Sequence, residues 1–176
     1  MIGASDTTAT ATGAEIFNIY EGDNKNVASG DYSHAEGYAT TASLTAAHAE
    51  GHYTLASSAG AHAEGYYTTA SGYYSHAEGN ATLASGGESH AEGWKTTASA
   101  LGAHAEGYLT CASNLYAHAE GYATLASTRY AHAEGEQSTA SGRNSHAQNQ
   151  YTIAQKRAQT AIGKYNVADT ASGDYG

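Results

Sequence analysis

The sequence has no proline and only one cysteine, one phenylalanine, one tryptophan and one methionine among 176 residues. Leu, Ile and Val are also few, and Ala, Thr and Ser take their place. So few bulky apolar side chains cannot fill the core of an ordinary globular domain. The lack of proline leaves backbone N–H groups free to join a hydrogen-bonded ladder, and the single Cys111 cannot form an intrachain disulfide. These absences favour a thin, layered structure stabilised by backbone pairing and small side chains.

Basic residues are scarce as well. Seven Lys and Arg stand against 17 Asp and Glu, which gives a formal net charge of −10. This balance argues against duplex nucleic acid or an anionic membrane as a partner. No apolar run has the length of a transmembrane helix, and the first residues lack the basic and apolar parts of a secretory signal. We therefore expect no membrane insertion and no signal peptide, so that export would use another route or the sequence is a piece of a longer protein.

A repeat of fourteen residues runs through most of the chain. Most repeats contain the phrase [Ser/Ala]-His-Ala-Glu-Gly and, a few residues later, the phrase Thr-x-Ala-Ser. Both phrases fit an alternation with period two, and neither has helical spacing. We therefore predict two strands of about five residues and two turns in each repeat. Only His52 lies out of register among the histidines.

The predicted fold is all-β, a parallel β-roll solenoid with two strands per fourteen-residue coil over residues 20–170. Residues 1–19 are expected to form a lead and cap, and residues 171–176 a tail or the start of a following segment. Alternation places the columns that begin with Ala35, Thr40 and Ala42 in the narrow interior and turns His and Glu outward. Such a roll buries little apolar area, so a single chain would be marginally stable and would need a partner.

The segments Ser75-His76-Ala77-Glu78-Gly79 and Thr82-Leu83-Ala84-Ser85-Gly86, together with Thr160-Ala161-Ile162-Gly163, resemble the head repeats of YadA-type trimeric autotransporter adhesins. The resemblance covers roughly residues 20–170. The phrase with His and Glu is also similar to repeats in phage tail-fibre and appendage proteins. The resemblance implies a left-handed roll, three copies around a threefold axis, and a structural and adhesive role without enzyme activity. It also implies a location on a virion or a cell surface, with a surface receptor as partner.

The resemblance also assigns a place to the histidines and glutamates. In the family, Val and Ile face the trimer axis at the positions of His76 and Glu78, so polar columns here replace an apolar core. A column of carboxylates alone would repel itself, and histidines beside it supply N–H donors and positive charge. We therefore predict a hydrogen-bonded seam that sets the register of a homotrimer. The seam residues are His34, Glu36, His48, Glu50, His62, Glu64, His76, Glu78, His90, Glu92, His104, Glu106, His118, Glu120, His132, Glu134 and His146.

Metal binding by the same columns remains an alternative function, because imidazole and carboxylate are good ligands for zinc, copper and nickel. Three symmetry-related histidines could surround one ion on the axis. Ligands in every layer, however, would crowd cations only about 4.8 Å apart. We therefore expect no cofactor beyond an adventitious divalent metal. Since no coil is singled out as a catalytic constellation, we expect no enzyme.

Aromatic residues follow the motif glycine in several coils. They are Tyr38, Tyr66, Trp94, Tyr108 and Tyr122, with His52 and Asn80 between them. We predict rings that stack from coil to coil along one edge of the solenoid, and a sugar- or surface-contacting stripe is the functional alternative. Ice binding is a lesser alternative. It would use the outward column that begins with Thr41, in which Leu and Cys interrupt the threonines.

Overall fold

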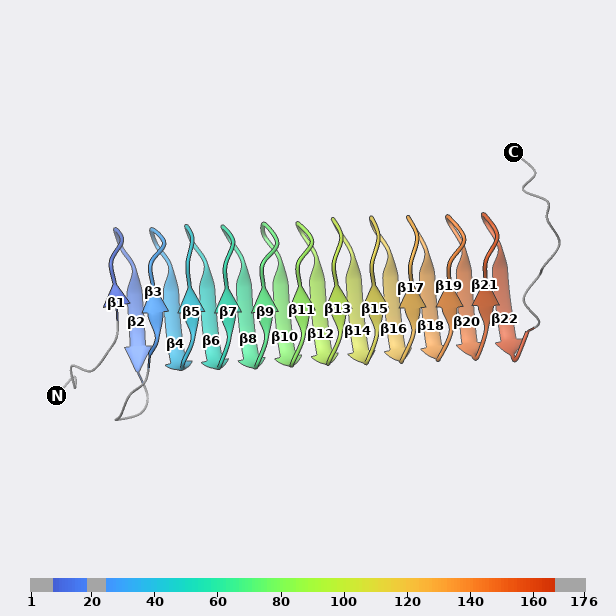
Figure 1. The fold of residues 1–176 in the computed structure, drawn as a ribbon, viewed down its shortest axis with the longest axis horizontal. Helices are drawn as coiled ribbons and strands as arrows, with labels where there is room; N and C mark the ends of the chain where they lie inside the picture. The colour runs from blue at the N-terminus through green and yellow to red at the C-terminus, as the bar shows by residue number, and fades with distance from the viewer. Residues whose placement is uncertain (1–7, 19–24, 167–176) are drawn as a thin grey trace.

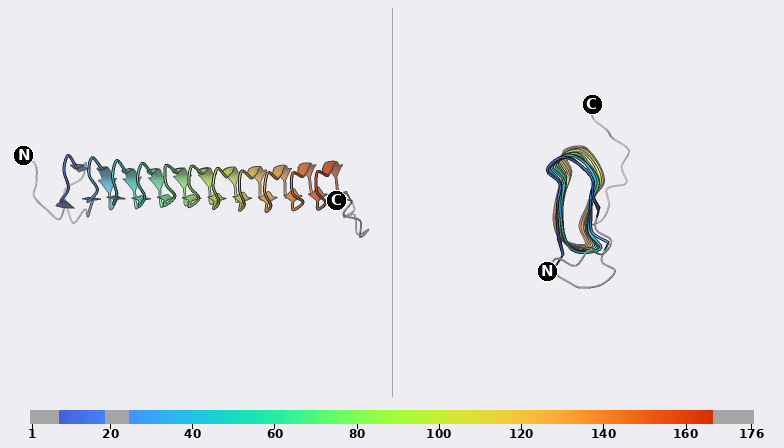
Figure 2. Two further views of the ribbon diagram at one scale, coloured as in Figure 1. Left: turned by 90° about the horizontal axis from the view of Figure 1, so that it is seen from above. Right: turned by 90° about the vertical axis from the view of Figure 1, so that its left-hand side faces the viewer.

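The computed structural model describes residues 8–18 and 25–166, and within these ranges every regular element is a β-strand. The strands form two parallel sheets of eleven strands each, and the chain alternates between them so that each coil adds one strand to each sheet (Figure 1). Seen end-on, the coils superimpose in one narrow, elongated outline (Figure 2). The predicted all-β parallel solenoid with fourteen-residue coils is therefore confirmed, while its handedness and trimeric state stay predictions.

The two sheets differ in the length of their strands. The short-strand sheet contains β1 (Thr8–Ala9), β3 (Val27–Ala28), β5 (Thr41–Ala42), β7 (Leu55–Ala56), β9 (Thr69–Ala70), β11 (Leu83–Ala84), β13 (Thr97–Ala98), β15 (Cys111–Ala112), β17 (Leu125–Ala126), β19 (Thr139–Ala140) and β21 (Ile153–Ala154). The long-strand sheet contains β2 (Glu15–Asn18), β4 (His34–Tyr38), β6 (His48–His52), β8 (His62–Tyr66), β10 (His76–Asn80), β12 (His90–Trp94), β14 (His104–Tyr108), β16 (His118–Tyr122), β18 (His132–Glu136), β20 (His146–Gln150) and β22 (Thr160–Lys164).

The second strand of each coil is shorter than the sequence predicted. It has two residues instead of about five, because a turn residue with positive φ stands close to each of its ends. In the coil of β5 these residues are Ala39, with φ 54°, and Ala46, with φ 55°. Left-handed backbone at such positions redirects the chain, which leaves room for only a brief ladder.

The strand register places equivalent residues of successive repeats next to each other. His76 pairs with His90, Ala77 with Ala91 and so on along the long-strand sheet. The first described coil departs from this spacing, since Glu15 pairs with His34. Among the described residues, the first strands of the two sheets start at Thr8 and Glu15, inside the segment that was expected to be a lead and cap. The predicted tail at 171–176 lies outside the described residues.

The interior holds only small side chains, as the alternation predicted. Ala35, Ala42 and their equivalents in the other coils are fully buried, and Thr40 and its equivalents line the same interior. Among the fully buried side chains of the described residues, none is larger than threonine except Asn26. The gap between the sheets therefore has room for methyl and hydroxyl groups and not for bulky side chains, which fits the composition.

Asparagines occupy the interior threonine position in the coils at both ends of the regular region. Asn26 lies fourteen residues before Thr40, and its amide accepts a hydrogen bond from the Thr40 N–H and donates one to the Gly37 carbonyl, both at 2.9 Å. Asn166 bonds both the N–H and the carbonyl of Ile153. These amides satisfy backbone groups near the ends of the regular repeat.

Candidate functional site

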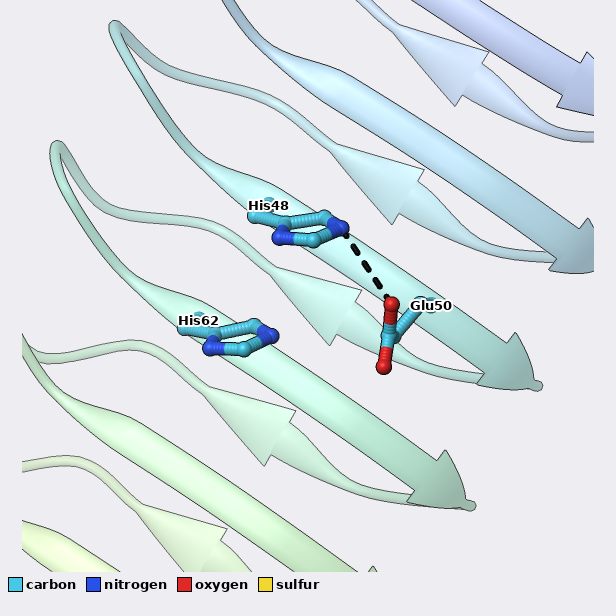
Figure 3. Close-up of side chains that lie close together, drawn as sticks. All are labelled: His48, Glu50 and His62. Carbon is cyan, nitrogen blue, oxygen red and sulfur yellow. Dashed lines mark ion pairs between the residues drawn. The ribbon is translucent and has the colours of Figure 1, made fainter.

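The motif histidines form one continuous column on the outer face of the long-strand sheet. From His48 to His146 each imidazole lies parallel to the next, with ring centroids 4.6–4.9 Å apart and interplanar angles of 1–7°. His34 differs, because its ring meets that of His48 at 89°. The parallel register of the strands fixes this spacing, since the Cα atoms of successive histidines are one strand apart. Figure 3 shows the parallel rings of His48 and His62 beside Glu50.

The glutamate column runs beside the histidines and pairs with them in two ways. Within a coil, the Nε2 atom of His34 lies 3.2 Å from a Glu36 oxygen, and the corresponding distance for His48 and Glu50 is 3.5 Å. Between coils, a glutamate contacts the histidine of the next coil instead, as in the pair of Glu120 and His132 at 3.1 Å. Both partners are about one third exposed in most pairs, so each pair, which is an ion pair only when the histidine is protonated, contributes about 0–1 kcal/mol at most. Hydrogen bonds join the two columns at His34, His90, His132 and His146. The predicted seam between chains stays a prediction.

Some imidazoles lack such a partner. Nε2 of His62 and of His118 is shielded from solvent and has no hydrogen-bond partner among the described residues. Burial lowers the pKa of both imidazoles, and the positive charge of the neighbouring histidines lowers it further, while adjacent glutamates oppose the shift. Burial likewise lowers the pKa of His48. These rings therefore favour the neutral form, in which one ring nitrogen is free to accept a bond.

Adjacent carboxylates also influence one another. A hydrogen bond with Glu64 raises the pKa of Glu50, and the same bond lowers the pKa of Glu64. This is the behaviour of two carboxyl groups that share a proton. At this pair, Glu50 therefore takes up a proton more readily than an isolated carboxyl group does, and Glu64 less readily.

The structure brings two histidines and one glutamate together in five places. In each group the two imidazole nitrogens and one carboxylate oxygen lie within 4.8 Å of one another. The groups are His48, Glu50 and His62; His76, Glu78 and His90; His104, Glu106 and His118; His118, Glu120 and His132; and His132, Glu134 and His146. Each group comes from two successive coils of one chain, whereas the sequence had suggested one histidine from each of three chains.

The predicted aromatic stack is present in two blocks at the ends of the long strands. Tyr38, His52 and Tyr66 stack at 4.7 and 5.2 Å, and Trp94, Tyr108 and Tyr122 stack at 4.3 and 5.1 Å. Asn80 separates the blocks. Tyr66, Tyr108 and Tyr122 are exposed, so their faces and edges can contact a ligand or a surface.

Sequence reasoning missed a link between glycine and serine in the turns. The hydroxyls of Ser33, Ser75 and Ser89 donate to the carbonyl of the glycine three residues earlier, at 2.7 Å. Serine stands before the motif histidine where that glycine is present, and alanine stands there in most other coils. This covariation among the repeats was the signal that could have revealed the bond.

A second missed feature is the packing of tyrosine against glycine. A Cβ atom added at Gly60 or Gly102 would lie 2.2 or 2.6 Å from the ring of Tyr74 or Tyr116 in the next coil. The tyrosines at these turns therefore cover the glycine of the preceding coil, which gives them a structural role.

None of the described residues belongs to a helix long and apolar enough to cross a bilayer. The chain matches no protein-family model and no curated protein.

Proposed function

We propose that this chain is a segment of a trimeric fibre, with a structural and adhesive function and no enzyme activity of its own. Three left-handed rolls pack around a threefold axis, and the His/Glu columns, defined as the motif histidines and glutamates from His34 to His146, face that axis. The observation that carries the proposal is one polar two-column surface with a histidine and a glutamate in each of eight successive coils, from His34 to Glu134. A ninth coil keeps His146 and has Gln148 in place of the glutamate.

The need for a partner follows from the size of the interior. Each coil buries mainly alanine and threonine side chains, and each alanine methyl contributes only about 0.8 kcal/mol when it leaves water. The His/Glu columns offer N–H donors and carboxylate acceptors side by side at a constant spacing. Such a surface is complementary to a copy of itself, because a donor column on one chain can face an acceptor column on another. Packing at the axis would also remove the partly exposed imidazoles from water.

The setting of the fibre follows from the resemblance and from the charge. A phage tail fibre or a cell-surface adhesin presents or spaces a receptor-binding surface, and the exposed rings of Tyr66, Tyr108 and Tyr122 are candidates for that contact. The net charge of −10 disfavours nucleic acid as a partner. Membrane insertion has no part in this proposal. Ice binding is disfavoured because leucine and cysteine interrupt the outward column of the short-strand sheet.

Chemical cross-linking at single cysteines tests which face meets the axis. In a Cys111→Ser background, His104→Cys places a thiol on the His/Glu columns, and Thr97→Cys places one on the short-strand sheet. The native thiol is removed because burial raises the pKa of Cys111, so its reactivity toward maleimide would differ from that of the two introduced thiols. A short bis-maleimide should link chains of the His104→Cys protein and leave the Thr97→Cys protein as single chains on a denaturing gel.

The two cysteine proteins must first show the same circular dichroism and melting behaviour. Equal linking of both, at a dilution that prevents random collisions, would place the interface elsewhere. Linking of the Thr97→Cys protein alone would assign the interface to the short-strand sheet and contradict the proposed seam.

A further inference from the structure

We propose that the His/Glu columns bind zinc or a similar divalent transition-metal ion, with one ion for every two coils. Two histidines and one glutamate of a single chain hold each ion. The sites are His48, Glu50 and His62; His76, Glu78 and His90; His104, Glu106 and His118; and His132, Glu134 and His146. All ligands of one site come from one chain, so the inference does not depend on the proposed trimer.

The geometry of the five groups selects this arrangement. In each, two Nε2 or Nδ1 atoms and one carboxylate oxygen already lie within 4.8 Å of one another. Four of the five groups have no histidine in common. The fifth, centred on Glu120, uses His118 and His132, which also belong to the groups of Glu106 and Glu134. An ion in every second coil therefore uses each histidine from His48 to His146 once.

This alternation removes the objection that ions in successive layers would be too close. Sites in every second coil are separated by two strand spacings, or roughly 9.6 Å. Coulomb repulsion between two ions halves when their separation doubles. Glu64, Glu92 and Glu120 stand in the second coil of the first three sites and are not among their ligands, so their charge lies between the carboxylate ligand of one site and that of the next and screens the two ions.

The charge of the columns matches the proposed occupancy. Eight motif glutamates run from Glu36 to Glu134. Four divalent ions would carry eight positive charges, so the filled columns would be neutral if every glutamate is ionised.

Binding requires movement of side chains but none of the backbone. Zinc bonds imidazole nitrogen at about 2.0–2.1 Å, so two histidines in a tetrahedral site have nitrogens about 3.3 Å apart. The parallel imidazoles of a site, with centroids 4.6–4.9 Å apart, must therefore tilt toward each other. Rings that are about one third exposed have the freedom to do so. Water can supply the fourth ligand.

The ligand set determines the class of metal. Two imidazoles and a carboxylate suit zinc, nickel and copper, whereas magnesium and calcium prefer oxygen ligands throughout. Zinc should therefore bind and magnesium should not. This difference distinguishes specific ligation from non-specific attraction of a cation to an acidic protein.

The first test measures stoichiometry on the tag-free, unmodified chain. After equilibration with Zn²⁺ and removal of free metal on a desalting column, elemental analysis should give four zinc ions per chain. A value below one, or one close to the number of histidines, would overturn the proposal. The solution mass is recorded in parallel, so that loss of the trimer and loss of metal binding are distinguished.

Two variants that each lose four histidines provide the matched comparison. His48→Gln, His76→Gln, His104→Gln and His132→Gln together leave no two motif histidines in adjacent coils. His48→Gln, His62→Gln, His76→Gln and His90→Gln together leave the last two sites intact. We expect no zinc ion per chain in the first variant and two in the second. Equal binding by both would show that isolated histidines hold the metal and would refute the paired sites.

Glutamate variants test the same assignment without touching the histidines. The set Glu50→Gln, Glu78→Gln, Glu106→Gln and Glu134→Gln removes a proposed ligand from every site. The set Glu36→Gln, Glu64→Gln, Glu92→Gln and Glu120→Gln removes as much charge from glutamates that are not proposed ligands. Zinc affinity should fall at least about tenfold more in the first set than in the second. An equal fall would mean that charge alone, and not ligation, attracts the ion. This comparison and the stoichiometry decide the question even if a histidine variant does not fold.

Discussion

Replacing the motif glycine in the middle of the solenoid should destabilise the chain strongly. Gly79 has φ 102°, a backbone conformation that residues with a side chain rarely adopt. A Cβ atom there would lie 2.2 Å from the carbonyl oxygen of Gly93 in the next coil. That oxygen belongs to the backbone of a packed sheet, so it cannot move away without disturbing the ladder. Gly79→Ala therefore combines dihedral strain with a backbone clash.

The magnitude follows from the two contributions. Holding alanine at such a φ costs about 1–3 kcal/mol. Displacing the neighbouring backbone adds a comparable amount, so the free energy of unfolding should fall by about 3–5 kcal/mol. For a chain of this length, each kcal/mol corresponds to about 2–4 °C, so the melting temperature should fall by about 6–20 °C.

Two other glycines separate the contributions. Gly163 has φ 117°, but a Cβ atom there meets no atom of the described residues within 4 Å, so Gly163→Ala should cost only the strain, about 1–2 kcal/mol. Gly87 has no positive φ, and the nearest atom to its added Cβ is a Leu101 side-chain carbon at 3.3 Å, which can move. Gly87→Ala should change the free energy of unfolding by less than about 0.5 kcal/mol.

The measurement is urea unfolding followed by circular dichroism, with thermal melting as a second probe. The expected order of destabilisation is Gly79→Ala, then Gly163→Ala, then Gly87→Ala. If Gly79→Ala and Gly87→Ala unfold at the same urea concentration, the close approach of the coils at the motif glycine is wrong.

Further predictions concern the interior and the imidazoles. The buried hydroxyl of Thr82 has no hydrogen-bond partner among the described residues, whereas the Thr152 hydroxyl bonds that of Ser138 at 2.9 Å. Thr82→Val should therefore leave stability unchanged or raise it by about 1 kcal/mol, and Thr152→Val should lower it by about 1 kcal/mol, with equal urea midpoints as the contradicting result. The pKa of several stacked imidazoles is lower in the folded state than the ordinary value of 6.5, so the folded state binds fewer protons than the unfolded state. The contribution of these imidazoles to the free energy of unfolding is therefore present above about pH 6.5 and is lost as the pH falls further. With a chelator present, the melting temperature should fall between about pH 7.5 and pH 5.5, and a rise over that range would contradict the burial of these rings.

The arrangement of one coil could be predicted from the sequence alone, because the sequence contains two periods. The fourteen-residue period fixes which residues stack, and the period of two along each phrase sorts Ala35 and Thr40 inward and His34 and Glu36 outward. Both are properties of backbone geometry, which does not depend on a partner. The stacking of the aromatic residues after the motif glycine followed from the same register.

The turns could not be predicted in the same way. Residues as different as Tyr53, Ala81, Lys95 and Leu109 all take positive φ at the equivalent turn position, so residue type gave no signal for the short second strand. The shape of the site was also hidden, because rotamers decide which glutamate meets which histidine. That a group such as His48, Glu50 and His62 assembles within one chain is visible only in the structure.

The solution mass of the unmodified chain, measured by light scattering on a sizing column with a chelator present, tests the proposed fibre most directly. Three copies of an 18.0 kDa chain should give roughly 54 kDa. A mass near 18.0 kDa over a wide range of concentrations would contradict the threefold assembly and leave the His/Glu columns facing water.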